Sequence, residues 1–426
     1  MLSREENELL TRAGPGTAMG ALMRRYWIPA LLAWELPEPD CPPVRVTLLG
    51  EALVAFRDGA GHLGLIEEHC AHRGASLYFG RNEECGLRCV YHGWKFDVTG
   101  QCVDMPSEPP GSTFKERVRL RAYPCAERGG VIWAYLGPPE RQPALPELEW
   151  ALLPEPQRFA SKRLQECNWL QAMEGGIDSS HISFLHRSFN LDATRLPNSQ
   201  GQEYVRRDRH PRFEVQDVDY GLLIAARRTV DEANYYWRIT PWLMPWYTII
   251  PPFGENPIGG HAWVPADDER CWAWSFDWHP ARPLSETELA TYRAGLGIHS
   301  ALIPGTWRPR ANQDNDYLID RQAQRTESMT GIVGISAQDC AVQESMGPIY
   351  DRTTEHLGTS DAAIIAARRR LLGGVRGLER GEEPPGLDAA AQRVRSASVV
   401  LPKDVPFHEG ARDSLIACPE SYVASA

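Results

Sequence analysis

The sequence contains no run of about 18 or more apolar residues, so we expect no transmembrane helix. It also has no excess of positive charge: 45 lysines and arginines against 56 aspartates and glutamates give a formal net charge of −11. That balance disfavours binding to nucleic acid or to an anionic membrane. The segment MLSREENELL is polar and lacks the layout of a secretory signal. We therefore expect a cytoplasmic protein with neither nucleic acid nor membrane as a partner.

Cysteine is scarce as well, with ten residues in a chain of 426, too few for a disulfide scaffold. Four of the ten nevertheless fall within 33 residues, in a stretch that also contains three histidines. The members of this stretch are His69, Cys70, His72, Cys85, Cys89, His92 and Cys102. Grouped thiols and imidazoles in a chain of this composition indicate a metal site.

The length predicts two or three domains. Short alternating runs broken by turn residues begin at Val44 and continue to about residue 137, a pattern typical of β-hairpins. Further along, helical segments are mixed with alternating stretches rich in Trp and Tyr, which indicate an antiparallel sheet. The predicted helices cover 165–190, 285–300 and 360–372, and the predicted strands cover 220–230, 235–242 and 261–276.

We therefore predict the α+β class, with a small all-β domain in front of a larger domain of antiparallel sheet and helices. A Pro-rich stretch at 138–156 is read as the segment between them. The tail is rich in Gly, Pro and Ala, and we expect it to be loosely held. The predicted parts are a helical lead at 1–43, the all-β domain at 44–150, the larger domain at 151–372 and the tail at 373–426.

The Cys/His stretch has two halves, Cys70-Ala-His72 and Cys89-Val-Tyr-His92, separated by 16 residues. Each half offers one thiolate and one imidazole from a tight loop. A structural Cys2His2 zinc site is the main alternative, but zinc modules usually pair like ligands within each short motif. Mixed pairs suit a [2Fe–2S] cluster in which two Cys hold one iron and two His the other, the arrangement of Rieske centres. The spacing favours the Rieske cluster.

A second candidate motif contains Asp178, His181 and His186. On a helix, Asp178 and His181 share a face, whereas His181 and His186 point in different directions. The two histidines can converge only if the helix ends or widens between them. A His-x4-His spacing alone is weak support for a metal. Beside a Rieske motif, however, it suits a non-haem Fe(II) held by two His and one carboxylate, with positions open for O2.

Residues 70–105 resemble the Rieske domain of ring-hydroxylating and demethylating oxygenases. The segments MRRYWIPA and FGRNEECGLRCVYHGWKFD are most similar to oxygenase components of the phthalate dioxygenase group, which also includes related O-demethylases. The resemblance runs to about residue 360 and implies a helix-grip-like catalytic domain. It implies Cys70, His72, Cys89 and His92 as cluster ligands, and His181 and His186 as ligands of the mononuclear iron.

The resemblance also selects the third iron ligand. Several carboxylates lie far enough along the chain: Asp314, Asp316, Asp320, Glu327, Asp339 and Glu344. The Gln-Asp step in GISAQDCAVQES matches the family pattern best, so we predict Asp339. Asp178 is predicted to orient His181 and to stand between it and a cluster-ligating histidine of a neighbouring chain. That arrangement implies electron transfer between chains in a ring, a homotrimer or stacked trimers.

Two further expectations follow from the cluster motif. Respiratory Rieske proteins carry an extra disulfide, but the corresponding positions here are Ala75 and Tyr91, so the resemblance implies a lower-potential centre that receives electrons from a reductase. The sequence has no dinucleotide fingerprint where a strand leads into a helix, so an NADH-dependent flavin or iron–sulfur reductase must be a separate partner. Cys85 is not part of the motif, and we expect it to be a small buried residue.

The substrate residues are predicted from the same family. The cluster RRDRHPR at 206–212 is by default a solvated face, but Arg207 could pair bidentately with a substrate carboxylate. Relatives specific for phthalate use a second arginine near PWLMPWY, where this chain has Met244. We therefore predict Arg207 and Met244 as substrate-binding residues, and a bulkier aromatic acid or biaryl beside Trp242 and Trp246. These aromatic residues are equally compatible with a core.

Three functions are compatible with these patterns. The first is the terminal oxygenase of a multicomponent system that uses a [2Fe–2S] cluster, Fe(II) and O2 to hydroxylate a small aromatic acid, with O-demethylation as the alternative reaction. The second is a Rieske electron carrier without oxygen chemistry, which leaves the His181 and His186 pair unexplained. The third is a zinc-stabilised binding protein. The sequence favours the first.

Overall fold

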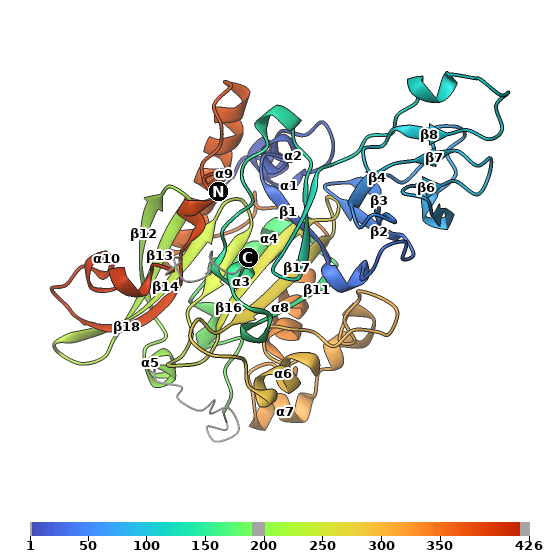
Figure 1. The fold of residues 1–426 in the computed structure, drawn as a ribbon. Coiled ribbons are helices and arrows are strands. Elements are labelled where there is room, and N and C mark those ends of the chain that lie inside the picture. Colours follow the sequence, from blue (N-terminus) through green and yellow to red (C-terminus); the bar gives the residue numbers. More distant parts are fainter. Residues whose placement is uncertain (1, 190–200, 418–426) are drawn as a thin grey trace.

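The computed structural model describes residues 2–189 and 201–417, and Figure 1 shows two unequal parts. The smaller part, coloured blue to cyan, projects at the upper right from a larger body built on one long twisted sheet. Every strand pair is antiparallel, as the alternating sequence patterns predicted. The predicted α+β class, with a small all-β domain in front, is confirmed.

The projecting part is built from two small sheets with a third sheet at its base. The first sheet has the order β2-β3-β4, formed by Val44–Leu48, Glu51–Arg57 and Leu63–Glu67. The second has the order β5-β6-β7-β8, formed by Arg81–Asn82, Leu87–Arg88, Lys95–Phe96 and Cys102–Asp104. The third has the order β1-β10-β9, formed by Trp27–Leu32, Val131–Tyr135 and Cys125–Arg128. Phe56, Leu87 and Phe96 are fully buried in the small core between the first two sheets.

The body contains an eight-stranded sheet in which seven strands follow the order β11-β17-β16-β15-β14-β13-β12 and β18 also pairs with β14. The strands in chain order are β11 Arg158–Gln165, β12 Arg212–Val218, β13 Gly221–Thr229, β14 Asn234–Leu243, β15 Tyr247–Ile250, β16 Ile258–Pro265, β17 Cys271–Trp278 and β18 Ala397–Pro402. One edge of strand β14 pairs with β13, and the other edge pairs with two strands, β15 and β18. Its end at Leu243 pairs with β15, and its start at Asn234 pairs with β18.

Several helices pack on the sheet of the body, among them α9, which has 18 residues. Their bounds are α1 Arg4–Thr11, α2 Ala18–Met23, α3 Glu149–Leu152, α4 Trp169–Ile177, α5 Gln202–Arg207, α6 Glu286–Arg293, α7 Arg321–Thr326, α8 Ile335–Glu344, α9 Ala362–Glu379 and α10 Phe407–Gly410. Helix α4 packs on β15 and β16 and also contacts α8. The second predicted metal site lies here, with Asp339 on α8 and both histidines in the segment that follows α4.

Two local expectations differ from the structure. The N-terminal segment is not only helical, because β1 pairs with β10 and places this segment in a sheet. The C-terminal tail is not loosely held over its described part. Helix α9 continues past residue 373, and β18 adds a strand to the main sheet. Sequence composition missed this strand because its partner, β14, lies more than 150 residues earlier in the chain.

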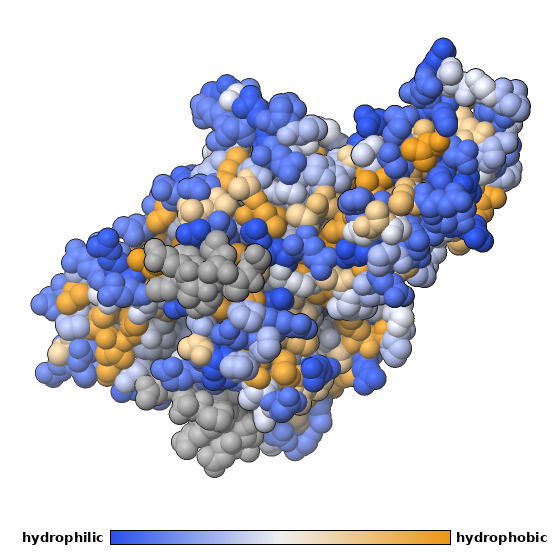
Figure 2. All heavy atoms as spheres, viewed as in Figure 1, coloured by the Kyte–Doolittle hydropathy of each residue, from blue (hydrophilic) through white to orange (hydrophobic). Residues whose placement is uncertain are grey.

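The projecting part exposes apolar side chains close to the predicted cluster loops. Phe79, Val90 and Tyr91 are 64%, 59% and 56% exposed. Figure 2 shows hydrophobic patches among hydrophilic residues on this part of the surface. Val90 and Tyr91 lie between the two predicted ligands Cys89 and His92, so the cluster loops themselves present apolar surface.

Candidate metal centres and active site

The two Cys/His loops have the same backbone design. In the first, the Cys70 amide donates to the Ala75 carbonyl at 2.9 Å, and the Gly74 amide donates back to the Cys70 carbonyl at 2.9 Å. The second repeats the closure, with the Cys89 amide donating to the Trp94 carbonyl at 2.8 Å. Each loop contains a glycine with positive φ, +73° at Gly74 in the first, which an L-residue with a side chain rarely adopts. The structure thus explains why each motif ends in glycine.

The four predicted cluster ligands face one another across these loops. Cys70 and Cys89 are each 3% exposed, and burial together with the nearby Cys89 thiol raises the pKa of Cys70 to about 11. The rings of His72 and His92 lie 4.4 Å apart, centroid to centroid, in an edge-to-face arrangement. The Nδ1 atom of His72 is buried without a hydrogen-bond partner. Two convergent thiols beside two convergent imidazoles fit the donor set of a Rieske cluster.

Cys85 lies outside this arrangement. It is exposed, whereas we expected it to be buried, and its φ of +56° places it in the tight turn between β5 and β6. The expectation was wrong because a turn of this kind directs its residues toward solvent. Cys85 still lies outside the Cys-x-His and Cys-x2-His loops, so the prediction that it does not bind the cluster remains.

The second site brings together three side chains from distant parts of the sequence. The Nε2 atoms of His181 and His186 are 3.0 Å apart, and Oδ1 of Asp339 lies 3.8 and 3.5 Å from them. Metal–nitrogen bonds of about 2.1 Å at right angles put two ligand atoms about 3 Å apart. The arrangement therefore fits a facial triad of two histidines and one carboxylate, the set typical of non-haem Fe(II).

The histidines converge because helix α4 ends before them. Asn168 caps its start by accepting from the Leu170 amide at 3.1 Å, and Asp178 is its C-cap residue. A single 3-10 turn at His181–Ser183 follows and turns the chain so that His186 faces His181. Of the two geometries that the spacing allowed, a helix end and a widened helix, the structure has the helix end.

The other ring nitrogen of each histidine faces a polar side chain. Asp178 Oδ2 lies 3.5 Å from Nδ1 of His181, and Oε1 of Gln338 lies 2.7 Å from Nδ1 of His186. Gln338 is itself fixed, because its Nε2 donates to the Ile332 carbonyl at 2.8 Å. Such partners orient an imidazole and leave Nε2 free for a metal. The sequence analysis predicted this role for Asp178 but missed Gln338, whose only signal was its place directly before Asp339.

The same contacts set the protonation of the site in the metal-free protein. Burial alone would lower the pKa of His181. The contact with Asp178 and the charge of Asp339 raise the pKa by more than burial lowers it, so the net pKa is above the usual value. Burial leaves the pKa of His186 below its usual value. Burial raises the pKa of Asp178, and the hydrogen bond from His181 more than offsets this, so the carboxyl stays ionised at neutral pH.

Contacts account for the other carboxylates considered as third ligand. Asp314 forms an ion pair with Arg308, and Asp320 caps α7 by accepting from the amides of its first turn. Glu344 accepts from the hydroxyl of Tyr317. Only Asp339, from the middle of α8, is placed within reach of both histidines among the described residues of this set.

Close packing fixes α4 against its neighbours. A Cβ atom on Gly176 would stand 2.1 Å from Cη2 of Trp263 on β16, and one on Gly175 would stand 2.2 Å from Nε2 of Gln343 on α8. Gln343 also accepts from Gln171 on α4, whose Nε2 lies 2.9 Å from its carbonyl oxygen. The adjacent glycines in the motif thus let α4 approach the sheet and α8 at once, which sets the spacing of the triad.

Comparison with known families assigns two regions of the chain to families. Residues 26–124 match the family of the Rieske [2Fe-2S] domain, and residues 134–416 match the family described as LigXa C-terminal domain like. The second match alone spans more than half of the chain. The chain belongs to the Rieske oxygenases.

Curated relatives of this Rieske oxygenase cover almost its full length. It is 41% identical to the 3-chlorobenzoate-3,4-dioxygenase oxygenase subunit of Comamonas testosteroni over 96% of this chain and 97% of that protein. It is 38% identical to the phthalate 4,5-dioxygenase oxygenase subunit of Pseudomonas putida over 96% and 94%. Among solved structures, the terminal oxygenase of carbazole 1,9a-dioxygenase from Nocardioides aromaticivorans has a similar fold, with a TM-score of 0.57, 19% identity, and coverage of 88% and 99%.

As a Rieske oxygenase, the protein uses a [2Fe–2S] cluster, a mononuclear Fe(II) and O2. The residues present fit both groups, since two thiols and two imidazoles converge in one place and a facial triad in the other. Within residues 2–189 and 201–417, no helix is long and apolar enough to cross a membrane.

The two predicted substrate residues have different surroundings: Arg207 is on α5, which contacts the His181–Ser183 turn, whereas Met244 is in the core. Arg207 is exposed at the end of α5, where its guanidinium donates to the backbone carbonyls of Thr229 and Val230. Met244 is 2% exposed and packs beneath α9, 3.3 Å from the position of a Cβ on Gly374. Met244 directly follows the end of β14 and is buried in the core of the body, and its role in substrate binding stays a prediction.

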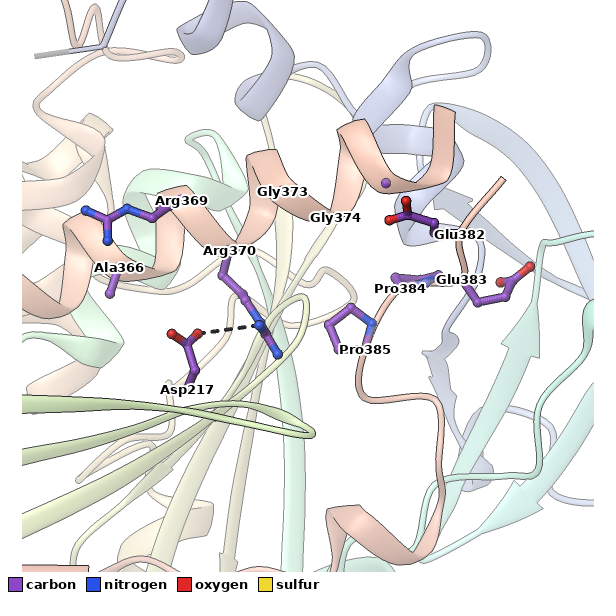
Figure 3. Close-up of a pocket in the computed structure, with 11 residues that line it drawn as sticks. Asp217, Ala366, Arg369, Arg370, Gly373, Gly374, Glu382, Glu383, Pro384 and Pro385 are labelled. Atoms are coloured by element: carbon purple, nitrogen blue, oxygen red, sulfur yellow. Dashed lines mark ion pairs between the residues drawn. The ribbon is translucent and has the colours of Figure 1, made fainter. Parts of the chain in front are cut away.

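The pocket in Figure 3 also lies away from the two metal sites. It has a volume of about 330 Å³ between α9 and the segment 382–385, and the ion pair of Asp217 with Arg370 spans one side of it. Neither predicted metal site contributes a residue to its lining.

Proposed function

We propose that this Rieske oxygenase is the terminal component of a multicomponent system that hydroxylates an aromatic carboxylate, by a dioxygenation like that of phthalate. The observation that supports it is the combination of the His181, His186 and Asp339 triad with full-length similarity to two proteins named as dioxygenases of aromatic acids. When bound, the mononuclear Fe(II) supplies O2 activation, with electrons delivered through the cluster.

The protein's own residues would serve this reaction in three ways. Asp178 keeps Nδ1 of His181 protonated and its ring fixed, and Gln338 does the same for His186. Asp339 completes one face of the site and leaves the opposite face open for small molecules. His181 and His186 are only partly exposed, which limits the access of bulk water to the reacting atoms.

Electrons are proposed to come from a separate NADH-dependent reductase, through the cluster, to the iron of a neighbouring chain in a homotrimer. The side chains of His72 and His92 are partly exposed, and Val90 and Tyr91 beside His92 are exposed. An apolar rim around a partly exposed redox centre supports its burial against another protein surface. Asp178 would stand on the receiving side of that contact.

The experiment that tests the activity is turnover of 3-chlorobenzoate, phthalate and methoxybenzoates with NADH, a generic reductase and ¹⁸O2. Incorporation of both oxygen atoms as ring hydroxyls is expected. Loss of a methyl group with formaldehyde release would instead establish O-demethylation, the reaction named for a relative in Sphingobium sp. that is 33% identical over 91% of this chain and 84% of that protein. Reduction of the cluster without oxidation of any substrate would contradict both.

A further inference from the structure

A histidine lies buried between two polar side chains at the β11 edge of the main sheet. His299 is 1% exposed and belongs to the loop at 294–301, which follows α6 and is called the α6 loop below. Its Nδ1 atom is 2.6 Å from Oγ of Ser161 on β11, and its Nε2 atom is 2.9 Å from Oδ2 of Asp277 on β17. The sheet therefore holds both nitrogens of the ring and fixes its orientation.

Aromatic side chains enclose this contact. The ring of Phe159 on β11 meets the ring of His299 edge to face at 4.8 Å, and the ring of Tyr292 on α6 lies 4.9 Å away. Burial raises the pKa of Asp277 above its usual value of 3.8, although the hydrogen bond from His299 lowers it. Polar groups in such surroundings cost free energy unless they keep their partners. Moving the α6 loop away from the sheet would remove those partners.

A second contact holds the same loop to the sheet. Ser275 on β17 is fully buried, and its hydroxyl donates to the Ile298 carbonyl at 2.8 Å. The loop is also tight, because a Cβ atom on Gly295 would stand 1.9 Å from the amide nitrogen of Ala301. Gly295 has a φ of +73°, which a residue with a side chain rarely adopts. The α6 loop is thus a compact unit that is anchored to β11 and β17.

The α6 loop in turn holds the start of α8. The hydroxyl oxygens of Ser300 and Ser336 are 2.6 Å apart and share a hydrogen bond, and the Ser336 amide donates to the Gly297 carbonyl at 3.3 Å. The first amides of a helix need acceptors from outside it. The N-cap residue of α8 is Gly334, which has no side chain to serve as an acceptor. The loop supplies an acceptor in its place.

The start of α8 is next to the iron site. Ser336 precedes Gln338 by two residues and Asp339 by three, so all three lie within one turn of the helix. Gln338 contacts Nδ1 of His186, and Asp339 is the carboxylate of the proposed triad. A continuous chain of contacts therefore runs from His299 through the α6 loop to two residues of the iron site.

We propose that His299 is a positioning residue for the mononuclear iron. Because the sheet holds both of its ring nitrogens, it fixes the α6 loop, and the loop fixes the first turn of α8. The carboxylate of Asp339 then already stands at the distance from the two histidines that a facial triad requires, so less ordering is left for iron binding. The proposal rests on the proposed triad and is independent of the substrate.

Iron affinity tests this role without turnover. His299→Phe keeps an aromatic ring but loses both polar contacts, and its affinity for Fe(II) should be about 10-fold lower than that of wild type. Competition of the holoenzyme with a ferrous chelator measures the loss, and the colour of the [2Fe–2S] cluster in the same sample should persist. His299→Gln, whose amide nitrogen can still donate to Asp277, should recover most of the affinity.

The link between the α6 loop and α8 is tested by variants that leave His299 in place. Ser300→Ala and Ser336→Ala remove the same hydrogen bond, and each should lower the iron affinity by a factor of about 3 to 10. In the double variant His299→Phe/Ser336→Ala, the loss should be no larger than in His299→Phe, because both changes break one chain of contacts. Losses that add would overturn the proposed route. If His299→Phe fails to fold, the two serine variants carry the test.

Ser285→Ala is the matched control. The Ser285 hydroxyl caps α6 by accepting from the Glu288 amide at 3.2 Å, so its removal destabilises the same region without breaking the chain to α8. This variant should melt at a lower temperature and keep the iron affinity of wild type. Wild-type affinity in His299→Phe and Ser336→Ala, or an equal loss in Ser285→Ala, would overturn the proposal. If Asp339→Ala binds iron as wild type does, the proposed triad itself is wrong.

Discussion

At the scale of the residue, the iron site depends on side chains that do not themselves bind metal. Gln338 reaches Nδ1 of His186 at 2.7 Å and is anchored by the Ile332 carbonyl, so it fixes both the tautomer and the orientation of the ring. His181 receives the equivalent support from Asp178. One support is an amide and the other a carboxylate, so only His181 has an anionic partner on its second nitrogen.

Gln338→Leu should therefore weaken iron binding by about 10- to 100-fold, because the leucine fills the space but leaves His186 free to rotate. Competition with a ferrous chelator measures the loss, and the colour of the [2Fe–2S] cluster in the same sample should persist. Gln338→Glu, which keeps an acceptor oxygen, should restore most of the affinity. Equal iron retention in Gln338→Leu and wild type would show that the contact is incidental.

At the scale of the element, a buried ionic network anchors α4. Glu174 on α4 accepts from Arg352 at 3.1 Å and from Arg368 on α9 at 2.6 Å, and Arg368 also pairs with Glu355. Burial alone would raise the pKa of Glu174, but the two arginines lower it below its usual value of 4.5. Since α4 ends at Asp178, this network and the adjacent glycines fix the position from which the iron ligands project.

Arg352→Met should destabilise the protein by about 3–5 kcal/mol, because it leaves part of the charge of Glu174 unpaired in a buried site. Because the pKa of Glu174 is lower in the folded than in the unfolded protein, its ionised carboxylate stabilises the fold at pH values above the unfolded pKa near 4.5. This contribution is lost as the pH falls through the folded pKa. Acidification from pH 7 should therefore lower the urea midpoint less in the variant than in wild type. Arg380→Met, which removes an exposed pair with Glu382, is the control and should not shift the midpoint.

At the scale of the whole molecule, the two metal sites lie on different parts of the chain. The cluster loops are on the projecting part in Figure 1, while α4 and α8 are in the body. Among the described residues, no hydrogen bond, ion pair or ring contact is recorded between a cluster ligand and the segment from Asp178 to His186. We propose that the chains assemble so that one chain's cluster meets another chain's iron site.

Complementation between two inactive variants checks this arrangement. Cys89→Ala removes a cluster ligand and Asp339→Ala removes an iron ligand, so each protein alone should be inactive. If electrons cross between chains, co-expressed and co-purified mixtures should regain about one quarter of the wild-type rate, because about one in four random neighbours pairs an intact cluster with an intact iron site. Cys85→Ala in place of Cys89→Ala should keep the cluster. An inactive mixed assembly would indicate transfer within one chain.

The sequence alone determined the features that depend on local spacing. The Cys70 to His72 and Cys89 to His92 motifs predicted paired loops because each loop closes on itself through backbone hydrogen bonds within six residues. The alternating pattern of β13 predicted a strand, and the Asp178 to His181 spacing predicted a shared direction, because these properties follow from chain geometry over a few residues. Asp339 needed family resemblance as well, since several carboxylates had equal local support.

The tertiary structure alone decided which distant residues meet. Gln338 contacts His186 because α8 packs on α4. Strand β18 forms because it pairs with the part of the β14 edge that β15 leaves free. Met244 is buried because it follows β14 directly and packs against α9 at Gly374. Local pattern carries no information on these contacts, because burial and partner across a sheet are set by strand order and register.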